Sequence, residues 1–275
     1  MSSLTLHCQC ASRGKAAEEQ VLLYSRAMLA ALAFSLSLLD TPPISRLAPA
    51  QPDAWSFDFS TYYWAASLSG EISIDGEEVD IEDGGDGGLS APALLGFLGS
   101  FEAHHGPWSY VFAPIFISAS DMKGGQPPNT DADVDIHAQV HELFVARELG
   151  DGWEWMAGAR YQRLDTTMDL SIGGVPQSSH ESTRTWTDPI VGLRYHSELG
   201  ADWSLHARGD VGGLGLGSDF AWNASAVFDY KFTELFGMFL GYRALSFRWE
   251  DLGGSGRSAY DLSMFGPVIG ASFSF

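Results

Sequence analysis

Histidine pairs are the residues of this sequence whose type first suggests chemistry, because imidazole is a common ligand of transition metals. His104 and His105 are adjacent, so on a strand their side chains point to opposite faces. His137 and His141 lie two pleats apart. Neither pair has a spacing at which two imidazoles of one strand hold the same ion. The sequence therefore predicts no metal site and no cofactor.

Charged residues recur at alternate positions, on what would be the inner face of a closed sheet. Arg160, Asp210 and Arg243 each lie about seven residues from a short turn, so we expect them at similar height. Glu142 joins them if a bulge turns it inward, because strict alternation from Ile136 to Val140 would point it at lipid. Such charges pair and fill a narrow barrel, which predicts a plugged lumen, with a selective pore as the alternative. The predicted lumen network comprises Glu142, Arg160, Asp188, Arg194, Arg208, Asp210 and Arg243.

The strands that must position these charges are recognised by alternating apolar and polar residues. Residues Trp203 to Val211 alternate apolar and polar side chains, as a strand with one face of each kind does. No convincing amphipathic helix follows Gln51. The predicted strands cover residues 55–68, 93–105, 108–120, 134–148, 153–170, 179–198, 203–215, 219–232, 236–249 and 260–275.

The links between these strands indicate the architecture. Short links at 104–108, 148–153, 198–203 and 232–237 alternate with polar, glycine-rich links at 69–92, 121–133, 170–179 and 250–259, and with a brief link at 215–219. This alternation puts the short links at one end of the sheet and the long links at the other, as is typical of a transmembrane barrel. A secreted soluble sandwich or lipocalin-like barrel, which is the alternative, gives no reason for such an arrangement. The sequence predicts an all-β, closed, antiparallel, up-and-down transmembrane β-barrel of ten strands, with eight as the alternative.

Aromatic residues crowd the strand ends, as the interfacial girdles of a membrane barrel would require. Trp108, Trp153, Trp203 and Phe236 mark one expected rim. The other expected rim comprises Tyr62, Trp64, Trp186, Phe220, Trp222, Trp249 and Tyr260.

The C-terminus alternates and ends on an aromatic residue. Phe265, Ile269, Phe273 and Phe275 share one face of the last strand. This ending resembles the C-terminal signal of bacterial outer-membrane β-barrels, which their assembly machinery reads. The stretch from Trp186 to Phe232 is similar to a pattern common among small members of that superfamily. The resemblance implies an outer-membrane location, with membrane lipid and the barrel assembly machinery as partners, and it carries no specific activity.

Some barrels of this superfamily are enzymes, and two of their site patterns bear on this chain. Omptin proteases use carboxylates with a histidine at the external rim, and lipid A deacylases use a serine with a histidine two residues away. Ser204 and His206 have the second spacing, but they lie near a short turn and point inward, away from acyl chains. We therefore expect no catalytic residue. The rim offers Asp131, Asp133, Asp165, Asp169, His180 and Glu181, without an Asp-x-His pair.

The N-terminus is typical of an export signal. Residues Ala27–Leu39 form an uncharged apolar run after Arg26, shorter than the about 20 residues of a membrane-spanning helix. Ala48 and Ala50 give a small-x-small cleavage site. We expect residues 1–50 to be an export signal and extension that is removed, and residues 51–275 to be one barrel domain.

Composition narrows the function. The formal charge of −20, with 35 acidic against 15 basic residues, excludes a nucleic-acid binder, which needs cationic side chains. The acidic link at 70–90 and the hairpin at 161–187 are the expected external contact surfaces. We expect a monomeric, non-enzymatic membrane protein with a structural or surface-contact role. The alternatives are a narrow solute channel and an enzyme acting on lipid or peptide.

Overall fold

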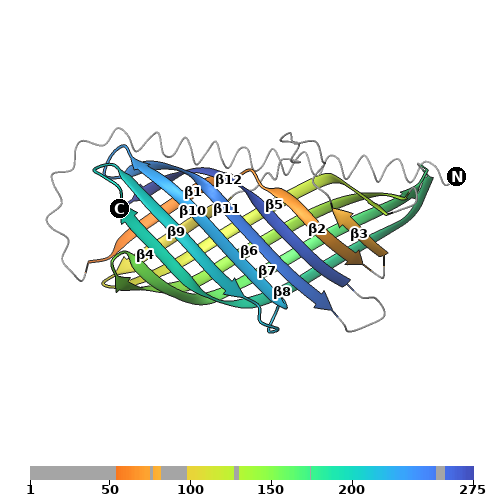
Figure 1. Ribbon diagram of the computed structural model, residues 1–275, viewed down its shortest axis with the longest axis horizontal. Coiled ribbons are helices and arrows are strands. Elements are labelled where there is room, and N and C mark those ends of the chain that lie inside the picture. The colour runs from red at the N-terminus through yellow and green to blue at the C-terminus, as the bar shows by residue number, and fades with distance from the viewer. Residues whose placement is uncertain (1–53, 75–76, 82–97, 127–129, 174, 252–257) are drawn as a thin grey trace. The chain divides into compact units, whose positions relative to one another are not determined.

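The chain forms antiparallel strands, as Figure 1 shows for its computed structural model. The structure describes residues 54–74, 77–81, 98–126, 130–173, 175–251 and 258–275. No helix in these ranges is long and apolar enough to cross a membrane. The predicted cleavage site at Ala48 and Ala50 lies outside them. The strands are β1 (Ser56–Trp64), β2 (Ser67–Ile74), β3 (Glu77–Ile81), β4 (Leu98–His105), β5 (Trp108–Gln126), β6 (Thr130–Gly150), β7 (Trp153–Ile172), β8 (Val175–Glu198), β9 (Trp203–Gly212), β10 (Phe220–Lys231), β11 (Phe236–Asp251) and β12 (Ser258–Ser274).

Ten of these strands close into a ring. Neighbours in sequence pair from β4 to β12, β4 pairs with β1, and β1 pairs with β12, all antiparallel. The pairing of β1 with β12 closes the ring, and Phe57 and Phe275 beside it exchange backbone hydrogen bonds of 3.1 and 2.8 Å. The hairpin of β2 and β3 lies outside this ring and bridges β12 to β5. The predicted ten-stranded barrel is therefore confirmed, and the eight-stranded alternative is wrong.

The strand β7 shows how the two faces of the barrel wall change along its length. Near its short turn the outer face carries Trp155, Ala157 and Tyr161, while Arg160 on the inner face is buried. Farther along, the outer face becomes polar, and the inner residues become apolar. The outer side chains there are Arg163, Asp165, Thr167 and Asp169, and the inner ones include Leu164, Met168 and Leu170.

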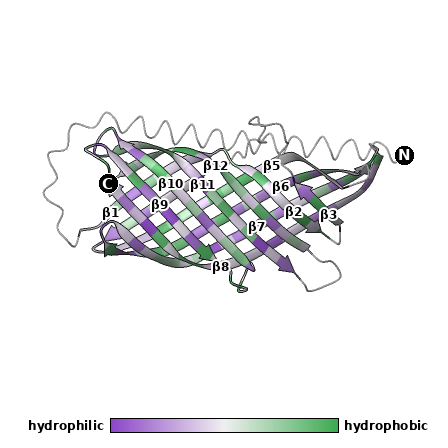
Figure 2. Cartoon of the chain, viewed as in Figure 1, coloured by the Kyte–Doolittle hydropathy of each residue, from purple (hydrophilic) through white to green (hydrophobic). Residues whose placement is uncertain are grey.

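This reversal divides the barrel into two parts. The membrane half, near the short turns, has an apolar outer face of the length that a bilayer requires of a tilted strand, about 9–11 residues. The external half has a polar outer face and an apolar interior, as a water-soluble barrel does. Figure 2 shows the alternation of hydropathy along the strands. Short turns are periplasmic in outer-membrane barrels, so the polar-faced half projects outward.

The reversal corrects the second predicted rim. Trp64, Trp186 and Tyr260 are 1, 7 and 0% exposed, because they face the interior of the barrel. Trp186 stacks on Trp249 at 5.3 Å between ring centroids. These aromatic residues belong to the apolar core of the external half, not to a lipid-facing girdle. On the first rim, Trp153 and Trp203 are exposed, as an interfacial position requires.

The external links also differ from the prediction, because the strands run farther. Strands β5 and β6 extend to Gln126 and from Thr130, and β7 and β8 extend to Ile172 and from Val175. These positions occupy most of the predicted links at 121–133 and 170–179. The predicted acidic link at 70–90 contains the end of β2 and all of β3, and its residues 82–90 lie outside the described ranges.

The wall is low at β9 and β10. These strands have 10 and 12 residues, whereas β8 has 24. The link between them turns sharply, with positive φ at Gly213, Leu214 and Gly215. It carries Ser218 against β8, where its backbone N–H donates to Asp188 over 2.6 Å. A tight turn therefore ends the barrel wall early on this side.

Candidate functional site

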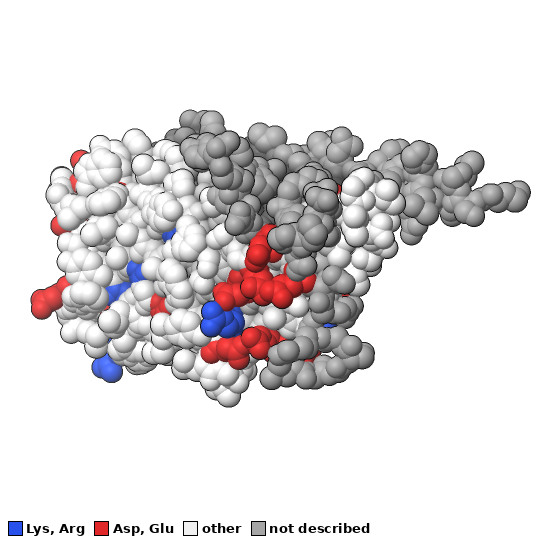
Figure 3. Space-filling view, turned by 45° about the vertical axis from the view of Figure 1, so that its right-hand side comes forward, with Lys and Arg blue, Asp and Glu red and all other residues white. Residues whose placement is uncertain are grey.

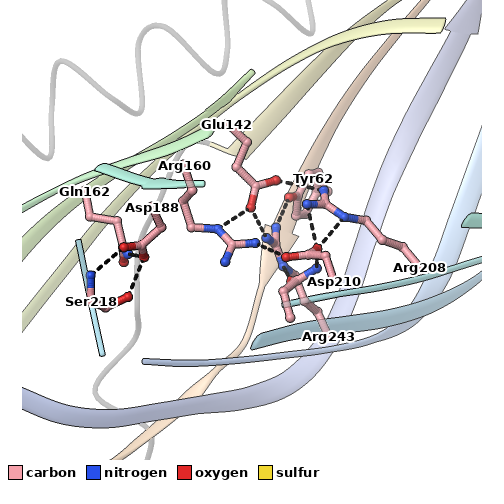
Figure 4. Close-up of polar contacts among 10 residues, drawn as sticks. Tyr62, Glu142, Arg160, Gln162, Asp188, Arg208, Asp210, Ser218 and Arg243 are labelled. Atoms are coloured by element: carbon pink, nitrogen blue, oxygen red, sulfur yellow. Dashed lines mark hydrogen bonds and ion pairs between the residues drawn. The ribbon is translucent and has the colours of Figure 1, made fainter. Parts of the chain in front are cut away.

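A cluster of buried charges fills the membrane half of the barrel (Figure 4). Arg160 donates from Nε to Glu142 over 2.8 Å and from Nη2 to Asp210 over 2.6 Å. Arg208 donates from Nη1 to Glu142 over 2.7 Å and from Nε to Asp210 over 2.8 Å. Each carboxylate is thus shared by two guanidinium groups. These residues lie on β6, β7 and β9, so side chains of separate strands can meet only inside the ring.

Arg243 extends the cluster across the barrel. It donates from Nε to Asn223 over 2.9 Å and from Nη1 to the hydroxyl of Tyr62 over 2.7 Å. Its Nη2 lies 3.6 Å from Glu142, which belongs to the far side of the ring. Asn223 in turn donates to Asp210 over 2.9 Å. The cluster therefore connects six of the ten ring strands, namely β1, β6, β7, β9, β10 and β11.

Asp188 and Arg194 lie on the same inner face of β8 but outside this cluster. Asp188 accepts from Gln162 Nε2 over 2.7 Å and from the Ser218 hydroxyl over 2.7 Å. Arg194 pairs with Glu102 at 2.8 Å and with Glu154 at 3.2 Å, nearer the periplasmic turns. The seven predicted lumen residues thus form one central cluster and two flanking groups.

Glu142 reaches the interior without a bulge. Strand β6 pairs in unbroken register around it, with Glu142 opposite Ala113 and Arg160. Ile136, Ala138 and Val140 face inward as well and are buried. The expectation that alternation would point Glu142 at lipid was wrong, because those three apolar residues belong to the external core.

Sequence reasoning missed several partners of the charges. Asn223 alternates with Ala221 and Ser225 on β10, so its inward position was readable from the pattern. Tyr62 was assigned to an aromatic rim, yet its hydroxyl binds Arg243. Gln162 and Ser218 carry no charge and gave no comparable signal.

The interior of the external half is apolar. A void of about 20 Å³ lies among ten apolar side chains of six strands. It has room for a water molecule but no polar lining to bind one, so it is expected to be dry. The lining residues are Leu68, Ile117, Ala119, Ile136, Ala138, Val140, Leu164, Phe247, Leu262 and Met264.

The outer face of the wall carries four of the predicted rim residues, Asp133, Asp165, Asp169 and Glu181. Asp165 lies on the outer face, where Arg163 pairs with it at 3.0 Å and Thr183 donates to it over 2.7 Å. These hydrogen bonds lower the pKa of Asp165 against the opposing effect of partial burial. Asp133 lies directly opposite Asp169 on the ladder. Of the other rim residues, Asp131 lies in β6 and His180 and Glu181 lie in β8.

Acidic side chains gather on the outer face of the external half, as Figure 3 shows from one side. Arg248, Asp261, Glu71 and Asp80 follow one another in a cross-strand row from β11 to β3. Glu71 also shares a hydrogen bond with Glu78, which raises the pKa of Glu71 together with slight desolvation and the nearby carboxylates. Arg248, the cation of these four residues, stands at one end of the row, so the three neighbouring carboxylates repel one another.

The periplasmic mouth holds a serine, a histidine and an aspartate in hydrogen-bonding order. Ser109 Oγ lies 2.9 Å from His104 Nδ1, and His104 Nε2 lies 2.8 Å from Asp58 Oδ2. Ser109 is only 2% exposed, and its hydroxyl also lies within 3.5 Å of Glu154. A nucleophile must reach its substrate, so this arrangement is better suited to filling the mouth than to catalysis.

Comparison with solved structures identifies the fold. The OmpT outer-membrane protease of Escherichia coli matches with a TM-score of 0.52 and 12% identity, over 84% of this chain and 99% of that chain. The translocator domain of the autotransporter NalP from Neisseria meningitidis matches with a TM-score of 0.39 and 12% identity, over 93% and 98%. The β domain of the Bordetella autotransporter BrkA matches with 0.39 and 13%, over 81% and 100%.

No family model matches the sequence, and no curated protein matches it. The structural likeness, at such low identity, concerns the fold alone. The predicted fold, a closed antiparallel barrel like that of the OmpT protease, is confirmed, and the apolar outer face of the membrane half suits the outer membrane as its location.

Proposed function

We propose that this outer-membrane barrel is a non-enzymatic protein with a sealed lumen, whose external half makes contacts at the cell surface. The observation that carries the proposal is the filling of both halves of the interior. Arg160, Glu142 and Asp210 occupy the membrane half at 0, 0 and 4% exposure, and apolar side chains occupy the external half. A hydrated ion would have to displace both layers to pass.

The external half supplies the proposed contact surface. Its outer face on β8 presents Thr183, Thr185 and Thr187, all exposed, beside the polar outer residues of β7. The acidic row that includes Glu71 and Asp261 lies on other strands of the same half. A rigid polar surface held beyond the membrane can bind partners without any change in the interior.

Single-channel recording in a planar bilayer tests the seal. The parent barrel should give no conductance steps at moderate voltage. Defined steps of the parent would replace the proposal with the narrow-channel alternative, and they should change when Arg160 or Arg243 is substituted.

A deletion strain tests the proposed role at the surface. It should keep its uptake of small solutes and its peptide and lipid hydrolysis, and it should lose attachment to surfaces or to other cells. Reintroduced parent chain should restore attachment, while a chain with Thr183→Lys and Thr185→Lys should restore it poorly. Loss of a hydrolytic activity, with attachment intact, would support an enzyme instead.

We also propose that residues 1–50 are removed on export and that the mature barrel is a monomer assembled by the barrel assembly machinery. The C-terminal alternation of Phe265, Ile269, Phe273 and Phe275 supports the second proposal. Mass measurement of the protein extracted from membranes would test both the cleavage and the oligomeric state.

A further inference from the structure

Two histidines face each other at the periplasmic mouth. His196 on β8 and His206 on β9 are direct cross-strand partners, with ring centroids 4.5 Å apart. Their Nδ1 atoms are 3.4 Å apart. The side chain of His196 is 43% exposed, so the pair is open to the solution that fills the mouth.

The remaining ring nitrogens are held by neighbours. His196 Nε2 lies 3.1 Å from Glu198 Oε1, and His206 Nε2 lies 3.2 Å from Ser204 Oγ. A carboxylate only accepts, so Nε2 of His196 carries the proton and its Nδ1 presents a lone pair. The Ser204 hydroxyl donates or accepts, so His206 can also place its proton on Nε2 and free its Nδ1.

We propose that His196 and His206 form a two-imidazole site for a divalent transition-metal ion such as Zn²⁺. Two nitrogens that each lie about 2.0–2.1 Å from a tetrahedral zinc ion are about 3.4 Å apart, which is the separation that the two Nδ1 atoms already have. Glu198 and Ser204 are the outer partners that orient the two rings. On binding, the His206 proton moves from Nδ1 to Nε2, so no net proton is released.

The site supplies two protein ligands and leaves the other positions to water. Within the described ranges, no group of three or more histidine, cysteine, aspartate or glutamate side chains is arranged to hold a metal ion. Glu198 favours a cation electrostatically, whereas Arg194 and Lys231 oppose it. This balance predicts a weak, exchangeable site and not a permanent structural metal.

Calorimetric titration with ZnCl₂ tests the proposal. The full chain is refolded in detergent, with Cys8→Ser and Cys10→Ser in every version so that thiols do not compete. The parent should bind one ion, and His196→Gln with His206→Gln should abolish that binding. Glu198→Gln should weaken it about 10–100-fold, because an outer partner of a ligand is lost. His104→Gln removes another histidine of the mouth and should leave binding unchanged.

Two further readings keep the test decisive. Heat-dependent gel mobility should show that every variant is folded. Co²⁺ in place of Zn²⁺ should give the intense visible absorption of a tetrahedral ion in the parent and not in the double variant. Absence of binding to the parent, or equal binding by the folded double variant, would overturn the proposal.

Discussion

Arg160 Nη2 lies 2.6 Å from Asp210 Oδ1, a contact that passes over β8 from β7 to β9. Because Asp210 also accepts from Arg208 and Asn223, one carboxylate connects three donors from three strands. Glu142 likewise binds cationic side chains from three strands, namely Arg160, Arg208 and Arg243. The two carboxylates therefore hold the cationic side chains that would otherwise repel one another inside the barrel.

Glu142→Gln should destabilise the barrel. The substitution removes one of the two carboxylates that the buried guanidinium groups of Arg160 and Arg208 share and leaves them with Asp210 alone, at a cost of about 3–5 kcal/mol. Urea unfolding followed by gel mobility measures the loss. Glu148→Gln changes an exposed carboxylate near the periplasmic turn and is the control. Equal stability of the two variants would contradict a structural role for the cluster.

The apolar interior of the external half predicts a sharp contrast between two adjacent residues of β7. Leu164 is 2% exposed and lines the apolar void, so Leu164→Ala should cost about 2–5 kcal/mol. Arg163→Ala removes an outward side chain and should change the unfolding midpoint little. The same urea titration compares them, and a larger effect of Arg163→Ala would mean that the faces are assigned wrongly.

The position of the membrane can be tested on one face of β8. In a chain with Cys8→Ser and Cys10→Ser, Thr185→Cys should react with a membrane-impermeant maleimide on intact cells, because this residue lies on the polar outer face. Leu193→Cys lies on the same face but in the apolar band, so it should stay unlabelled until the membrane is dissolved. Labelling of both residues on intact cells would argue against a membrane boundary between them.

Phe275→Ala separates assembly from stability. The backbone N–H and C=O of Phe275 both form hydrogen bonds with the backbone of Phe57. A side-chain substitution leaves these hydrogen bonds possible. Refolding in detergent should therefore proceed almost as in the parent, while the amount of folded barrel in cells should fall. Ser274→Ala is the control on the inner face. An unchanged yield in cells would remove the proposed assembly signal.

The acidic row of the external half predicts a pH effect. The pKa of Glu71 is raised in the folded protein, chiefly by the hydrogen bond with Glu78, so the folded state binds this proton more tightly than the unfolded chain. Its contribution to stability is present below the unfolded pKa and is lost as pH rises through the folded pKa. Glu71→Gln should therefore unfold slightly later than the parent at neutral pH, and this advantage should vanish in acid. A constant difference at all pH values would assign the effect to another cause.

The number and order of the ten ring strands followed from the sequence because alternation and short turns are local signals, whereas the hairpin of β2 and β3 was not predicted. The alternation along β9 from Trp203 to Val211 and the turn at Asp151 needed no knowledge of the rest of the chain. The charged inner residues Arg160 and Asp210 followed from the same alternation. Their actual partners did not, because a contact over two strands depends on barrel closure and shear.

The reversal of the two faces is what sequence reasoning missed. Period-two alternation shows that Val140 and Trp186 each share a face with the residues two positions away in the same strand. It does not show whether that face meets lipid or a protein core. Assuming that apolar always means lipid sent Trp186 and Tyr260 to an outer rim. The His196 and His206 pair was missed for a related reason, since spacing within one strand cannot show residues that meet between strands.

In the external half, strands such as β7 and β8 alternate polar residues on the outer face with residues that face the dry interior. Substitutions at Asp165, Thr183 or Thr185 can therefore accumulate without repacking Leu164 or Trp186 behind them. A population of cells exposed to antibodies or phages could diversify this surface at every second position and keep the same barrel.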